Sequence, residues 1–173
     1  TCCFSLVALP DITIAWQQVI SDSVIAGGSS LVVGFFVLDI LEPIERIFDV
    51  TTGMSLAELK DTRNNLLQKL QELAPGTFNH SRQVADIAEA AAEAIGCNSL
   101  LAYVGGLYHD IGKMNKPEYF VENQTGFNRH STLKPSMSLL IIIGHVKDGI
   151  ELAKEYDLPR EIIHFIAAHH GTT

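Results

Sequence analysis

Apolar residues recur at helical spacing along most of the chain, and no stretch shows the alternating pattern of a half-buried strand. Beyond residue 50, helices are expected at about residues 55–73, 80–95, 99–113, 136–156 and 159–171. A long polar loop is expected at about residues 115–134. The clearest apolar stripe lies in the segment 80–95 and consists of Val84, Ile87, Ala88, Ala91, Ala92 and Ile95. The pattern predicts an all-α fold.

A different pattern marks the beginning of the chain, where residues 23–38 carry no charge. A helix over residues 23–41 would be about 28 Å long, close to the thickness of the hydrocarbon core of a membrane. The alternatives are a buried core helix and a cleavable signal peptide, but a signal peptide needs basic residues where Asp22 stands. We therefore expect one transmembrane helix, and the flanking charges do not indicate its orientation.

The charge composition sharpens this division of the chain. Charged residues make up 18% of the sequence and the net charge is −8. Residues 1–41 contain only three charged residues, Asp11, Asp22 and Asp39. An acidic chain of this kind argues against non-specific binding to nucleic acid, so no DNA or RNA partner is expected. It does not exclude a nucleotide held by metal ions, which supply positive charge locally.

The positions of the histidines are the main functional signal. Relative to the apolar stripes, four of them are expected to point inward: His80, His145, His169 and His170. His109 precedes Asp110 at the end of a predicted helix, whereas His164 lies off the inner face and is interpreted as a surface or packing residue. Each of these features alone also fits a histidine bonded to a backbone carbonyl. Together, on four helices, they favour shared metal ions, because buried imidazoles need partners.

An aspartate among these histidines adds a ligand that can bridge two metal ions. Two ions a few ångströms apart can hold a hydroxide as nucleophile and neutralise a phosphate during displacement. Nitrogen and oxygen ligands without thiolate suit manganese or iron, with zinc less favoured. We therefore expect two divalent transition-metal ions as cofactors.

Long stretches of the sequence resemble one family of metal-dependent phosphohydrolases. The strings ELAPGTFNHS (72–81), YHDIGKMNKPEYFVENQ (108–124) and HHGTT (169–173) are similar to seven-transmembrane HD-domain proteins, the PgpH-type cyclic-di-AMP phosphodiesterases. The resemblance covers about residues 40–173. It implies the end of a membrane domain at residues 1–41, a linker and connecting helix at 42–75, and an HD domain at 76–173. A Ser-x-x-Glu pattern at residues 55–58 predicts the start of the connecting helix.

The resemblance also implies the ligand set of the two ions. Asp110 is the expected bridging ligand and a catalytic residue. The family has one more ligand, an aspartate on a later helix, that no residue here matches. The resemblance therefore implies a fragment, an HD-domain helical bundle truncated at its C-terminal side. The implied metal ligands are His80, His109, Asp110, His145, His169 and His170.

Substrate contacts are expected from residues that follow the His-Asp pair. Lys113 lies one helical turn beyond it and is expected to face a substrate phosphate as a second catalytic residue; a helix-terminal lysine without that role is the alternative. In the polar loop, aromatic, amide and imidazole groups could hold a purine by stacking and hydrogen bonds. Such groups also cap helices in ordinary loops. The candidates for substrate binding are Tyr119, Asn123, Gln124 and His130.

The function expected from this resemblance is hydrolysis of a cyclic dinucleotide, cyclic-di-AMP to linear pApA, by in-line attack of a metal-bridging hydroxide. One alternative is a membrane-anchored binding or sensory module without turnover, and another is hydrolysis of a different nucleotide. The expected location is the bacterial plasma membrane, with the HD domain facing the cytoplasm. Homodimer formation is a further hypothesis.

Overall fold

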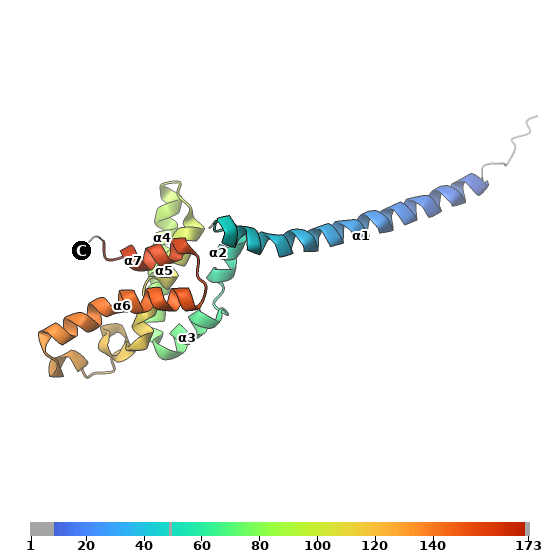
Figure 1. The fold of residues 1–173 in the computed structure, drawn as a ribbon. Coiled ribbons are helices and arrows are strands. Elements are labelled where there is room, and N and C mark those ends of the chain that lie inside the picture. Colours follow the sequence, from blue (N-terminus) through green and yellow to red (C-terminus); the bar gives the residue numbers. More distant parts are fainter. Residues whose placement is uncertain (1–8, 49, 172–173) are drawn as a thin grey trace, which may run out of the picture. The chain divides into compact units, whose positions relative to one another are not determined.

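A computed structural model describes residues 9–48 and 50–171, and every regular element in these ranges is a helix. The all-α prediction is therefore confirmed. The chain divides into two compact units, residues 1–50 and 51–173. The first contains one long helix, and the second contains the helical bundle that carries the histidines (Figure 1).

The first unit consists of helix α1, Leu9–Phe48, which is 40 residues long. Within it, the segment Trp16–Leu41 has 26 residues, a mean hydropathy of 2.1 and no buried position. The predicted span 23–41 lies inside this segment. Helix α1 is longer than the predicted helix over residues 23–41, since it also includes the polar residues Gln17, Gln18 and Ser21. By length and composition α1 could cross a membrane.

The second unit begins with two short helices where one was predicted. Helix α2 is Gly53–Lys60 and helix α3 is Asn65–Leu73. The prediction of a start at Ser55 was wrong, because the side chain of Thr52 accepts a hydrogen bond from Ser55 N at 3.4 Å and caps α2. The break follows from Asp61, which has an extended backbone, and from Asn64, which caps α3.

Four more helices build the remainder of the bundle: α4 (Pro75–Ala94), α5 (Ser99–Tyr108), α6 (Pro135–Glu155) and α7 (Arg160–Ala168). Helix α4 packs on α5, and α6 packs on α7. The core between the helices includes Leu66, Leu67, Leu70, Val104, Leu107, Tyr108, Ile111, Ile162 and Ile166.

The inner face of α4 differs from the predicted stripe. Ile87 and Ile95 are 70% and 76% exposed, whereas Ala85 is fully buried. A Cβ atom on Gly106 of α5 would lie 2.9 Å from Ala85 Cα, so the two backbones are almost in contact. Two helices can approach this closely only where the facing residues are small. The larger apolar residues of α4, such as Ile87 and Ile95, therefore lie on its exposed face.

The segment after α5 is also shorter and tighter than predicted. Helix α5 ends at Tyr108 instead of near residue 113, and a 3₁₀ helix, η1, follows at Ile111–Asn115. The predicted loop contains three more 3₁₀ helices, η2 (Pro117–Tyr119), η3 (Val121–Asn123) and η4 (Arg129–Thr132). Gly112 in η1 lies against α6, where an added Cβ would be 1.9 Å from the carbonyl oxygen of His145.

Gly112→Ala should therefore destabilise the bundle by about 1–3 kcal/mol, because the new methyl group meets backbone atoms that cannot rotate away. Gly144→Ala is the matched control in α6, since no atom would lie within 4 Å of its Cβ. That variant should be stabilised by about 0.5–1 kcal/mol. Urea unfolding followed by circular dichroism measures both. Equal stability of the two variants would contradict the close contact of η1 with α6.

Candidate metal centre

The six side chains predicted to bind metal come together in one place. His80 lies on α4, His109 and Asp110 end α5, His145 lies on α6, and His169 and His170 follow α7. They form two groups of three, in each of which the ligand atoms lie within 4.8 Å of one another. One group consists of His80, His109 and Asp110, and the other of His145, His169 and His170.

The Asp110 carboxylate stands between the two groups. Its Oδ2 atom lies 3.1 Å from His109 Nε2 and 3.9 Å from His80 Nε2. Its Oδ1 atom lies 3.4 Å from His145 Nε2 and 3.5 Å from His169 Nε2. Each carboxylate oxygen thus faces a different set of imidazoles, which is the arrangement a bridging ligand needs.

Asp110 is also buried, with 2% of its surface exposed, and Oδ1 has no hydrogen-bond partner among the described residues. An isolated buried carboxylate oxygen is costly. A metal ion would satisfy this oxygen, so the donor set fits a divalent metal ion.

Backbone carbonyls fix the orientation of three of the imidazoles. His109 Nδ1 lies 2.7 Å from the carbonyl of Gly106, and His169 Nδ1 lies 2.8 Å from that of Ile166. His145 Nδ1 forms the same contact with the carbonyl of Ile142. In each case the carbonyl belongs to the residue three positions earlier. The contact makes Nδ1 the donor and leaves the lone pair of Nε2 for a metal.

The electrostatics of the centre favour the metal-binding protonation states of three residues, Asp110, His145 and His170. His109 differs: burial acts to lower its pKa, but its contact with Asp110 outweighs burial and raises that pKa. Burial lowers the pKa of His145 and of His170, which keeps these imidazoles neutral. Burial acts to raise the pKa of Asp110, but its close contacts with His109, His169 and Lys113 outweigh burial and hold that pKa well below its usual range. A neutral imidazole and an ionised carboxylate are the forms that coordinate metal.

The centre has a closed side and an open side. The side chains of Asp110 and His145 are 4% and 3% exposed, whereas that of His80 is 48% exposed. His170 is also exposed. A solute could therefore reach the two groups past His80 and His170.

Lys113 extends the centre toward the loop. Its Nζ lies 2.8 Å from Asp110 Oδ2 and 2.9 Å from Glu122 Oε1. Burial acts to lower the pKa of Lys113, but its ion pairs with Asp110 and Glu122 outweigh burial and raise that pKa. The lysine therefore carries a positive charge at the edge of the centre.

The four predicted substrate-binding residues have partners within the loop and α4. Tyr119 and His130 meet edge to face with ring centroids 5.4 Å apart, and His130 Nε2 lies 2.9 Å from the carbonyl of Tyr119. Gln124 donates a hydrogen bond to the same carbonyl at 3.2 Å. Asn123 is bonded instead to Thr77 at the start of α4. These contacts give the loop a defined shape.

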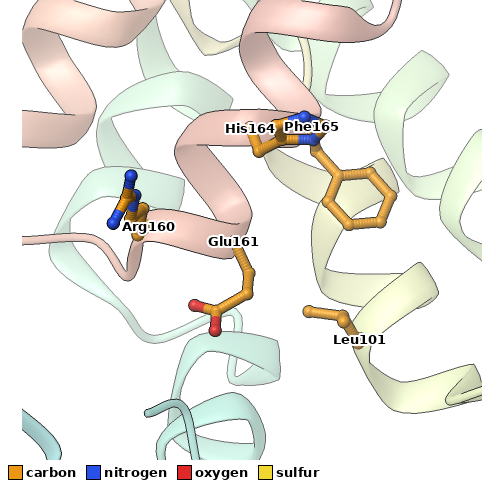
Figure 2. A pocket seen from close by; sticks show the side chains of 5 residues that line it. All are labelled: Leu101, Arg160, Glu161, His164 and Phe165. Carbon is orange, nitrogen blue, oxygen red and sulfur yellow. The ribbon is translucent and has the colours of Figure 1, made fainter. Parts of the chain in front are cut away.

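His164 does not join the metal centre. It is exposed on α7 and lines an open pocket together with Leu101, Arg160, Glu161 and Phe165 (Figure 2). In Figure 2 Leu101 comes from α5, and the other labelled side chains come from α7. This position agrees with the prediction of a surface or packing residue.

Three residues near the centre were not predicted from the sequence. Glu122 pairs with Lys113, and Thr77 donates a hydrogen bond to Glu122. The centroid of the Phe120 ring lies 5.1 Å from Lys113 Nζ and 5.7 Å from the centroid of the His145 ring. Glu122 and Phe120 lie in irregular structure, where no periodicity relates a residue to its partner. The only available signal was their position in the string YHDIGKMNKPEYFVENQ.

Comparison with known proteins places this geometry in a family. The HD domain family matches residues 77–173. The chain belongs to this family. The match includes all six residues of the two groups, and HD domains depend on divalent metal.

The HD domain has close relatives among characterised proteins. The cyclic-di-AMP phosphodiesterase PgpH of Listeria monocytogenes is 48% identical over 143 residues, which cover 81% of this chain and 20% of that protein. PgpH of Bacillus subtilis is 40% identical over 151 residues, covering 87% of this chain and 21% of that protein. The chain thus spans about a fifth of the length of these relatives.

A solved structure is also similar to this HD domain. It is the crystal structure of the L. monocytogenes PgpH HD domain in complex with cyclic-di-AMP. The match has a TM-score of 0.63 and 52% sequence identity, and it covers 65% of this chain and 53% of that chain. This likeness confirms the predicted HD-domain fold.

His169→Ala should reduce the metal bound to the HD domain, because it removes one of three donors from its group. We expect a loss on the order of one ion per chain after loading with Mn²⁺, measured by inductively coupled plasma mass spectrometry. His164→Ala is the matched control on the same helix and should keep the wild-type metal content. Equal metal content in the two variants would exclude His169 as a ligand.

Proposed function

We propose that this HD domain is part of a metal-dependent phosphodiesterase that hydrolyses a cyclic dinucleotide, and that the substrate is cyclic-di-AMP. The observation that carries the proposal is the buried Asp110 carboxylate, whose two oxygens face two separate sets of imidazoles. The similarity to PgpH proteins supports the substrate assignment.

The chain's own residues suggest how the reaction is supported. Asp110 and the five histidines would hold two ions, manganese or iron. When bound, these ions would supply the positive charge that activates water and stabilises a phosphate under attack. The burial of Asp110 and His145 keeps water away from one side, which strengthens the electrostatic interactions there. The open side beside His80 and His170 would admit the phosphodiester.

The positive charge of Lys113 complements this arrangement. The chain has a net charge of −8, so an anionic dinucleotide needs local positive charge to bind. Lys113 lies within 2.8 Å of Asp110 and is 15% exposed, so its ammonium could donate a hydrogen bond to a phosphate oxygen at the centre. We assign it that role.

The loop that follows would contact the bases. The edge-to-face pair of Tyr119 and His130 is an aromatic surface on which a purine could stack. Gln124 would form amide hydrogen bonds with a base. Asn123 would contact a base from its position beside Thr77.

The first unit would anchor the enzyme in the membrane. The segment Trp16–Leu41 is long and apolar enough to span a bilayer. We propose that residues 1–41 end a membrane domain, that 42–75 connect it to the HD domain, and that the HD domain faces the cytoplasm of a bacterial cell. Association into a homodimer is part of this proposal.

Replacement of both His109 and Asp110 by Ala should abolish metal content and hydrolysis together. The wild-type protein with Mn²⁺ should convert cyclic-di-AMP to pApA faster than it hydrolyses cyclic-di-GMP, a deoxynucleotide or a nucleoside monophosphate in competition. Product analysis by chromatography measures both results.

Other outcomes would redirect the assignment. Hydrolysis that survives in the double variant would refute the site. Faster turnover of another nucleotide would refute the substrate. Tight binding of cyclic-di-AMP with no product at any metal loading would identify a sensory module without turnover.

The membrane anchor is tested by two charged substitutions in α1. Val32→Arg with Phe36→Arg should release the 173-residue chain from membranes, since each arginine near the centre of a span costs about 2.5–3.5 kcal/mol. Ile47→Arg with Phe48→Arg is the control, because these exposed positions follow the span in the same helix. The fraction that resists alkaline carbonate extraction is measured. Release of the control, or retention of the first variant, would contradict the assigned span.

A further inference from the structure

The ion pair between Lys113 and Glu122 is a feature that the ligand set does not explain. Lys113 Nζ lies at nearly equal distances from two carboxylates, 2.8 Å from Asp110 Oδ2 and 2.9 Å from Glu122 Oε1. The two acids differ in their surroundings. Asp110 faces the imidazoles of the metal centre, whereas the side chain of Glu122 is 22% exposed and contacts none of them.

Metal binding would change the balance between these two contacts. Cations held by Asp110 share its negative charge and repel an ammonium group nearby. The attraction of Lys113 to Asp110 would then weaken, while its attraction to Glu122 would remain. Lysine has four rotatable bonds and a strongly hydrated ammonium, so without a fixed counter-charge it would turn toward solvent.

Glu122 is itself fixed, which is what a counter-charge needs in order to hold a lysine in place. Its Oε1 accepts a hydrogen bond from Thr77 Oγ1 at 3.1 Å, and Thr77 is fully buried. The next residue, Asn123, donates to Thr77 Oγ1 at 2.8 Å and accepts from Thr77 N at 3.1 Å. The hydroxyl thus donates to one side chain and accepts from the other.

The backbone holds the same junction. A Cβ atom on Gly76 would lie 1.8 Å from the carbonyl oxygen of Glu122, so η3 touches the first turn of α4 directly. That turn leads to His80 three residues after Thr77. Glu122 is therefore attached to a helix that carries a metal-ligand candidate, and its distance from the centre is set by the bundle.

We propose that Glu122 is a positioning residue, which holds the Lys113 ammonium at the edge of the metal centre so that it can contact a substrate phosphate. The proposal deepens the proposed function and rests on it. Glu122 acts through Lys113 and does not itself touch metal or substrate. Thr77 and Asn123 keep Glu122 in place.

The first test is a double-mutant cycle on phosphodiester hydrolysis in the full chain loaded with Mn²⁺. Glu122→Gln, which keeps the size of the side chain and removes its charge, should slow hydrolysis of cyclic-di-AMP about 10- to 100-fold, the range for a charged hydrogen bond. In the Lys113→Met background the same substitution should cost nothing further. Glu118→Gln is the control, because its side chain forms no ion pair or hydrogen bond with residues 9–48 or 50–171, and it should retain wild-type rates.

A purely structural role would give a different pattern. If Glu122 only fastens the loop to α4, Glu122→Gln should slow hydrolysis by the same factor with and without Lys113, and it should lower the metal content as well. Equal factors in the two backgrounds would overturn the proposal. Wild-type metal content in Glu122→Gln, together with a non-additive loss of rate, would support it.

A second test requires no turnover. The amine of Lys113 is acetylated with an amine-reactive ester in the Mn²⁺-loaded chain, and its rate is followed by mass spectrometry against Lys147, whose side chain is 81% exposed. Lys113 should react several-fold faster in Glu122→Gln than in wild type, relative to Lys147. Unchanged reactivity would refute the positioning role even if hydrolysis is normal. Increased reactivity in a chain that hydrolyses no dinucleotide would support the positioning role and refute the proposed function.

Discussion

The burial of one carboxylate constrains the arrangement of the whole bundle. Ionised Asp110 is almost inaccessible to water, and removing a charge from water costs several kcal/mol unless other groups compensate. The compensating groups come from four helices of the bundle: imidazoles from α4, α6 and the end of α7, and the neighbouring imidazole at the end of α5. The helices must therefore converge on this residue, and the two halves of the candidate metal centre are built from parts of the chain far apart in sequence.

Two of the converging imidazoles lie at the ends of helices. His109 and His169 both stand just beyond the last helical residue, and each turns its Nδ1 to a carbonyl three positions back. The last carbonyls of a helix have no partner within the helix, so this hydrogen bond satisfies the helix end and orients the ring at once. A helix-end carbonyl that would otherwise lack a partner thereby orients the imidazole of a candidate metal ligand.

Helical periodicity indicated that histidines on separate helices would share one site, and the family resemblance implied the full candidate set, including His109 and Asp110; the structure brings these residues together. The prediction from helical periodicity failed where the distance between two backbones decides which residues are buried. On α4, Ala92 of the predicted stripe is buried, but Ile87 is exposed and Ala85 is buried against Gly106, so hydrophobicity alone did not select the whole inner face. It also failed where the chain is irregular. The partnership of Glu122 with Lys113 depends on the path of a 3₁₀ segment, which no repeat in the sequence encodes.

Glycines at the helix contacts bring neighbouring backbones close together, which the candidate metal ligands alone could not do. Gly106 brings α5 to the backbone of α4, and Gly112 and Gly149 bring η1 and α6 to each other. Without intervening side chains, these separations are set by the van der Waals radii of main-chain atoms and cannot relax as a layer of flexible side chains could. At these contacts the helices that carry the imidazoles can adapt to a cation by rotating side chains but not by approaching one another more closely.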